Sequence, residues 1–240
     1  MRRWGVTSDD GDMPAPDYAV EYSACRSRIR AMLADVSVSD AAVIVPTCPD
    51  WTVHDVCAHI AGVSAALVAR DNPGPDVQAW VDRLVHERQS KTIAELLDEW
   101  ESVGPGFESI MQAVPKAFGG LVYDVVAHEH DIRGALGLPG DRDSDGVWAS
   151  LEILVAMVQR DLAAQGNTAG LLHLRADDRE WTVGSGEPEV SIDTSAWELM
   201  RLLGSRRSRD QILAAGWKGD VEPFIAAMAH LPLPVGDIVE

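Results

Sequence analysis

The stretch from Leu121 to Gly137 constrains the fold more than any other part of the sequence. Its apolar residues recur at helical spacing and form one stripe, made of Leu121, Val125, Ile132 and Leu136. Asp124 and His128 lie on or beside this stripe, four residues apart. Because an isolated carboxylate is costly to bury, we expect a partner for it nearby. The stretch therefore predicts a helix inside a bundle, with polar groups that face inward.

A second helical stretch, WTVHDVCAHIAGVSAAL, carries another inward-facing histidine. His59 lies one turn after Val56 and beside Ile60, on the apolar side of that helix. Two imidazoles and one carboxylate from two helices of a bundle, with one position left open, match the ligand set of a catalytic divalent metal site. We therefore predict a metal centre at His59, Asp124 and His128. Zinc is favoured, although the same ligands also suit iron, nickel or manganese.

The pair formed by Asp124 and His128 also has a simpler interpretation. Residues four apart on a helix have Cβ atoms roughly 5 to 6 Å apart, which suits either one shared metal ion or one hydrogen bond on a surface helix. Spacing alone leaves both alternatives open. The other five histidines are expected to have structural or surface roles. Among them, His130 falls about 200° around the helix from His128 and should face solvent or a neighbouring loop.

The order of the helical patterns predicts a bundle. Long amphipathic stretches cover residues 18–36, 53–70, 92–114 and 121–137, and a further helix covers residues 147–166. Thr52 and Asp55 have the form of a capping box, and Gly104-Pro105-Gly106 should kink or interrupt the third stretch. We predict a frayed tail at residues 1–15 and an up-and-down four-helix bundle over residues 16–167.

The periodicity changes after residue 167. Residues 171–193 contain three short runs separated by Asp-Asp-Arg and Gly-Ser-Gly-Glu-Pro, which predicts a small antiparallel sheet. Short helical stretches follow it. A sheet with helices after an all-helical segment indicates a small α+β domain over residues 168–240. The predicted fold class is therefore mainly α, with a helical bundle followed by a small α+β domain.

Charge and cysteine content exclude several classes of function. The chain has 38 acidic and 20 basic residues, a net charge of -18, which disfavours nucleic acids and anionic membranes as partners. Three cysteines without CxxC spacing predict neither a disulfide framework nor a thiolate zinc site, and they suit a reducing cytoplasm. Neither a secretory signal nor a run of 18 apolar residues is found, so we expect a soluble cytoplasmic protein. The sequence does not indicate an oligomeric state.

Arginines gather near the C-terminal end of this otherwise acidic chain, at Arg201, Arg206, Arg207 and Arg209. A planar guanidinium group is well suited to bind a substrate carboxylate. The alternative is a set of solvated charges at the end of a helix, and the sequence leaves both open.

Three segments together resemble a known family. The segments VPTCPDWTVHDVCAHIAG, DVVAHEHD and SRRS are similar, in order and spacing, to the mycothiol-dependent maleylpyruvate isomerase family within the DinB-like superfamily. The resemblance spans nearly the whole chain. It implies a zinc ion held by His59, by the acidic residue at position 124 and by His128, with mycothiol as the thiol cosubstrate. It also implies that Arg206 holds the substrate carboxylate.

Two positions depart from the family pattern. The family typically has a glutamate where this chain has Asp124, and a glycine where it has Ser205. The resemblance implies an isomerase or thiol transferase that adds a thiolate to an electrophilic small molecule. Two other functions stay open: a non-catalytic metal-binding or interaction module on the same fold, and a helical regulator whose Asp-His pair is incidental.

Overall fold

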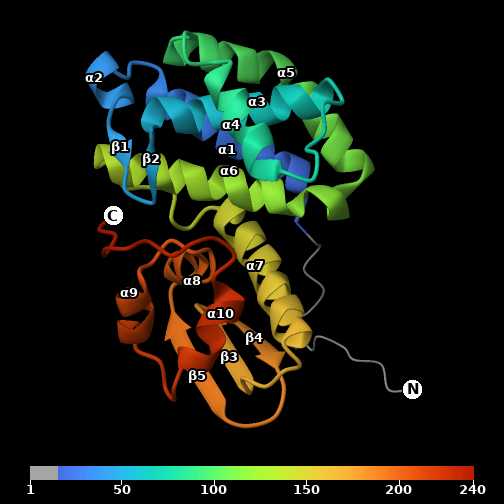
Figure 1. The fold of residues 1–240 in the computed structure, drawn as a ribbon, viewed down its shortest axis with the longest axis vertical. Coiled ribbons are helices and arrows are strands. Elements are labelled where there is room, and N and C mark those ends of the chain that lie inside the picture. The colour runs from blue at the N-terminus through green and yellow to red at the C-terminus, as the bar shows by residue number, and fades with distance from the viewer. Residues whose placement is uncertain (1–15) are drawn as a thin grey trace. The chain divides into compact units, whose positions relative to one another are not determined.

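The computed structural model describes residues 16–240, without the side chains of residues 115–117. The tail expected at residues 1–15 lies outside the described residues. Contacts within the chain define two compact units, one over Asp17–Gly140 and the other over Asp141–Val239 (Figure 1). The division therefore lies near residue 140, whereas the sequence patterns placed it at residue 167. The mainly α fold, with a helical N-terminal region and a small α+β part after it, is confirmed.

Four long helices form the first unit, as the periodicity predicts. They are α1 (Tyr18–Leu33), α3 (Val53–Val68), α5 (Ile93–Ala113) and α6 (Pro115–Leu136). Helix α3 packs against α5, and α1 packs against both α5 and α6, so that these helices lie side by side around one core (Figure 1). Two short helices complete the helical part, α2 (Val38–Ala41) and α4 (Val77–His86).

Helix α6 is buried on all sides along its middle part. Every residue from Val125 to Ile132 is buried, including four consecutive polar residues. A helix that is buried on all sides lies in the centre of its unit rather than at its surface. His130 is 3% exposed, which excludes the first of its two expected positions, facing solvent or facing a neighbouring loop. The polar residues of α6 therefore need partners inside the protein.

Local sequence signals set the ends of these helices. The capping box at Thr52 and Asp55 is confirmed, because each side chain binds the backbone of the other residue. Gly137 ends α6 in the left-handed conformation, with φ 64°. Helix α5 runs through Pro105 without interruption, so of the two predicted outcomes, a kink or an interruption, the interruption does not occur. Gly104 has a steric role instead: a Cβ there would lie 2.7 Å from the guanidinium group of the buried Arg26.

A two-stranded hairpin precedes α3. Strand β1 (Ile44–Val45) pairs in antiparallel fashion with β2 (Cys48–Thr52), and Val53 follows directly as the first residue of α3. Strand β1 contacts α6, and β2 contacts α3. The hairpin therefore brings the side chains of β2 close to the two helices that carry the predicted metal ligands.

The second unit combines a long helix with a sheet and short helices. Helix α7 (Asp145–Ala164) precedes β3 (Leu171–Ala176), β4 (Arg179–Gly184) and β5 (Glu189–Thr194). The chain continues through α8 (Ala196–Leu203), α9 (Arg209–Ala214), the 3-10 helix η1 (Glu222–Phe224) and α10 (Ile225–Met228). Helix α7 packs against β4, α8 and α10, which explains why it belongs to this unit and not to the bundle.

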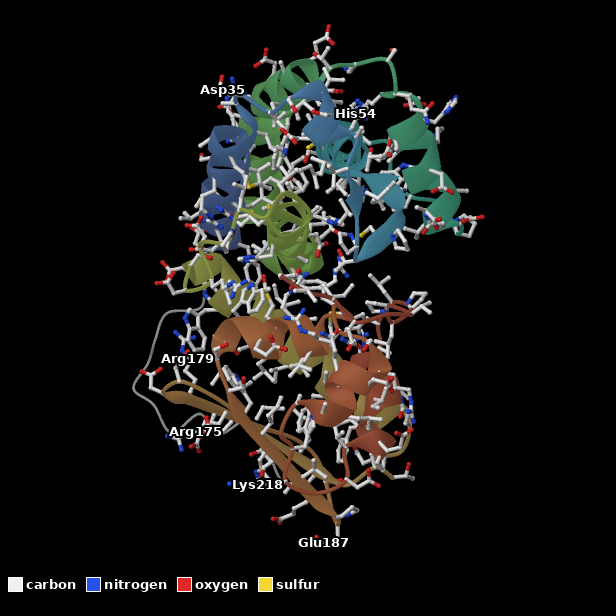
Figure 2. The ribbon with its side chains drawn as sticks, turned by 90° about the vertical axis from the view of Figure 1, so that its left-hand side faces the viewer. Asp35, His54, Arg175, Arg179, Glu187 and Lys218 are labelled. Carbon is white, nitrogen blue, oxygen red and sulfur yellow. The ribbon has the colours of Figure 1, made fainter. Side chains whose placement is uncertain are left out.

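The sheet is mixed, so the antiparallel prediction is wrong for one pair of strands. Strand β3 lies in the middle, antiparallel to β4 and parallel to β5. The connection from β4 to β5 passes the beginning of β3 at Gly170, where a Cβ would lie 2.1 Å from the Pro188 carbonyl oxygen. Glycine with φ 112° makes this crossing possible. Figure 2 shows Glu187, in the same connection, at the end of the sheet.

Candidate metal centre

The three predicted ligands come together in the first unit. His59 on α3 and His128 on α6 both direct Nε2 at the Asp124 carboxylate, at 3.2 Å from Oδ2 and 3.5 Å from Oδ1 respectively. One ligand atom from each residue lies within 4.8 Å of the other two. The imidazole rings stand edge to face, with centroids 5.1 Å apart. These donors suit a divalent ion that binds imidazole and carboxylate groups.

Asp131 fixes the orientation of His128. Its carboxylate Oδ2 lies 3.1 Å from Nδ1 of His128, and its side chain is fully buried. A metal-binding histidine typically donates its other ring N–H to a carboxylate or carbonyl group, which leaves the remaining nitrogen free for the ion. The bond to Asp131 therefore presents Nε2 toward Asp124. Asp131 was missed as a site residue, although its position three residues after His128 places it on the same side of α6.

His59 is positioned by packing. Its Nδ1 is buried and has no hydrogen-bond partner among the described residues. The ring of Trp51, on β2, lies against it with centroids 5.0 Å apart and reaches toward His128 at 6.2 Å. Trp51 therefore covers both imidazoles. The sequence pattern carried no signal for this role, because it depends on the hairpin that folds back over α3 and α6.

The electrostatics of the centre favour a cation. Burial by itself would lower the pKa of His128, but the charge of Asp124 and hydrogen bonds to Asp131 and Cys48 outweigh burial and raise the pKa to about 10. Two carboxylates therefore place an excess of negative charge around one imidazole. A divalent ion at Nε2 would satisfy the same charge and would displace the proton.

Asp124 forms the open side of the centre. Its side chain is 33% exposed, whereas those of His59 and His128 are 8% and 5% exposed. A small hollow lies beside Asp124. Besides Asp124, it is lined by Tyr22, Ile60, Val63, Phe107, Leu121 and Val125. A small molecule that reaches the ligand atoms would therefore approach along Asp124.

The arginine cluster lies in the second unit. Arg207 binds Glu198 through two nitrogens, at 2.8 and 2.7 Å, and Arg209 pairs with Glu222. Arg209 is exposed, as the interpretation of solvated charges expects, whereas Arg207 is only 6% exposed and is held by Glu198. Arg206 is 4% exposed, and its Nη1 donates to the Gly204 carbonyl oxygen at 3.2 Å. Its predicted role as a clamp for a carboxylate stays a prediction.

Ser205 stands where the resemblance leads us to expect glycine. Its backbone is left-handed, with φ 59°, a conformation in which glycine is favoured. The serine hydroxyl accepts a hydrogen bond from the Leu231 amide at 3.1 Å. The chain therefore forms a left-handed turn here with a serine.

Comparison with known families supports the N-terminal part of this picture. Residues 22–118 match the family model of the mycothiol maleylpyruvate isomerase N-terminal domain. This part of the chain is therefore similar to that domain. The resemblance inferred from the sequence is thereby confirmed, and it relates the helical unit to mycothiol and to DinB-like metal-binding domains. No curated protein and no solved structure matches the chain.

The match to the mycothiol maleylpyruvate isomerase N-terminal domain reaches only part of the centre. It includes His59 and ends at residue 118, before Asp124 and His128. The convergence of all three side chains therefore comes from the geometry of the structure. No helix in the described part of the chain combines the length and the apolar character that crossing a bilayer requires.

Proposed function

We propose that this chain is a divalent-metal enzyme that uses a low-molecular-weight thiol, mycothiol, to act on an electrophilic small molecule. The observation that carries this proposal is the approach of two imidazole Nε2 atoms to one partly exposed carboxylate. The family of residues 22–118 supports mycothiol as the thiol. The reaction is an isomerisation or a thiol transfer, and zinc is the metal we favour.

The protein residues have distinct tasks in this proposal. His59 and His128 supply neutral nitrogens, Asp124 supplies negative charge on the accessible side, and the bond from Asp131 keeps the His128 ring in one orientation. A divalent ion held by these residues would lower the pKa of a thiol and so supply a thiolate at neutral pH. In an isomerisation, the thiolate adds to an activated cis double bond, the new single bond rotates, and the thiolate leaves.

Arg206 is the proposed partner of a substrate carboxylate, by resemblance to the family. Its guanidinium group could form the two parallel hydrogen bonds that carboxylates accept. An Arg206→Lys variant retains the charge and loses this geometry. We expect a raised KM for a carboxylate substrate with unchanged metal content. An unchanged KM would remove Arg206 from the proposal.

Elemental analysis of the purified chain tests the metal centre directly. We expect one equivalent of a divalent metal that is lost in the His59→Ala and His128→Ala variants. His86→Ala is the matched control, because His86 is exposed on α4 and belongs to neither metal-binding group of the structure. Equal metal content in His59→Ala and His86→Ala would contradict the proposal.

A second candidate function is a non-catalytic metal-binding module. Asp124, one methylene shorter than the family's glutamate, and Ser205 both motivate it. The metal-loaded protein should be assayed with mycothiol and an electrophilic substrate, in parallel with an Asp124→Glu variant. Thiol-dependent turnover by the unmodified chain supports the enzyme. Bound metal without turnover in either protein supports the module.

The expected surroundings of the protein follow from its charge and its cysteines. A net charge of -18 disfavours nucleic acids and anionic membranes, so the proposed partners are the small electrophile and the thiol. All three cysteines are free thiols, which suits a reducing cytoplasm.

A further inference from the structure

His128 contacts a second group of side chains besides the proposed metal centre. Cys48, His128 and Asp131 each offer a ligand atom within 4.8 Å of the other two. Cys48 lies on β2 of the hairpin and is partly exposed, while His128 and Asp131 are buried on α6. The hairpin therefore brings a thiol to the imidazole that the first centre also uses.

The two nitrogens of His128 face different carboxylates. Nε2 lies 3.5 Å from Asp124, and Nδ1 lies 3.1 Å from Asp131. Asp131 therefore gives the ring a second carboxylate, and the Cys48 sulfur lies within 4.8 Å of the ligand atoms that His128 and Asp131 offer. A thiolate, an imidazole nitrogen and a carboxylate are the three ligand types that zinc and cobalt accept in proteins.

Burial makes this second group a costly place for negative charge. The Asp131 side chain is fully buried, and a thiolate at Cys48 would add a further charge beside it. Buried charges are stable when they are paired or coordinate a metal ion. A divalent ion would balance both charges at once.

We infer that Cys48, His128 and Asp131 form a second metal-binding set, which takes a thiophilic divalent ion on the Nδ1 side of His128. The inference goes beyond the proposed function and shares only His128 with its metal centre. When both sets are filled, the ring would bind one ion through each nitrogen as an imidazolate, and the Nδ1 proton that otherwise binds Asp131 would be released to solvent. The cysteine spacing argued against a site built from thiolates alone. This mixed set is compatible with that argument, because it needs only one cysteine.

Titration of the metal-free full-length chain with Co2+ tests the inference by absorption. A thiolate ligand gives a charge-transfer band in the near ultraviolet, whereas the set made of His59, Asp124 and His128 gives only visible bands. We expect both kinds of band in the unmodified chain. The Cys48→Ser variant should lose the near-ultraviolet band and retain visible bands. Circular dichroism of each variant confirms that the fold is intact.

Two further variants separate this inference from the proposed function. Cys57→Ala is the matched control, because Cys57 is a buried thiol on α3 outside both groups, and it should retain all bands. His59→Ala should retain the near-ultraviolet band and lose visible intensity. The unmodified chain could instead show no near-ultraviolet band, while its visible bands respond to His59→Ala. This result would overturn the second metal-binding set and leave the proposed metal centre at His59, Asp124 and His128 intact. A near-ultraviolet band that persists in Cys48→Ser would also overturn it.

Discussion

Glu129 is a buried carboxylate whose loss should weaken the helical unit. Its side chain is fully buried on α6, between the two histidines of that helix. Arg28 donates to it from α1 with three hydrogen bonds of 2.7 to 3.0 Å, and Arg133 donates at 3.0 and 3.1 Å. The Cys25 thiol adds a contact of 3.1 Å. This carboxylate therefore joins α1 to α6 directly beside His128.

The Glu129→Gln substitution removes the charge and retains the shape. Removing one partner of a buried ion pair leaves an uncompensated charge and typically costs 3 to 5 kcal/mol. The side chains of Arg28 and Arg133 are 21% and 13% exposed, so water relieves part of this cost. We therefore expect the free energy of unfolding to fall by about 3 kcal/mol, the lower end of that range.

Urea unfolding followed by far-ultraviolet circular dichroism measures this loss. Asp98→Asn is the matched control, because its pair with Arg30 also joins two helices but is exposed, at 73% and 42% for the two side chains. Such exposed pairs contribute about 1 kcal/mol or less. If Glu129→Gln and Asp98→Asn lower the free energy of unfolding equally, the reasoning from burial is refuted.

Three other predictions test separate parts of the structure. Thr52→Ala removes the capping box at the start of α3 and should lower the free energy of unfolding by about 1 kcal/mol in urea. In the metal-free native protein a disulfide reagent should titrate one thiol, Cys48, because Cys25 and Cys57 are buried and burial raises the pKa of both. Burial also lowers the pKa of His230 below its unfolded value of 6.5, although Asp161 opposes this effect. The unfolded chain therefore binds more protons as the pH falls below that value, and unfolding free energy measured from pH 7 to pH 5 should decrease more steeply in the unmodified chain than in His230→Gln.

Local patterns were sufficient to predict the helices and the ends of several. The capping box at Thr52, the glycine stop at Gly137 and the four apolar stripes all correspond to observed features. The errors concern relations between distant segments. The parallel pairing of β5 with β3 depends on a crossing at Gly170, and the place of α7 depends on which surface its apolar side covers. Periodicity indicates which side of a helix or strand is buried, but it does not indicate which other element covers that side.

The same distinction explains which parts of the metal centre the sequence could indicate. Asp124, His128 and Asp131 share one helix, so their spacing determines that they lie on neighbouring positions, and an inward carboxylate already demands a partner. Trp51 and Cys48 contact His128 from strand β2, because the hairpin folds back over α6. Residue spacing along the sequence does not predict this fold-back. Both residues lie in the same five-residue strand, and one covers the rings while the other supplies sulfur. The surroundings of His128 therefore depend on strand β2 as much as on helix α6. Substitutions in β2 should consequently alter metal binding, although they leave the three predicted ligands unchanged.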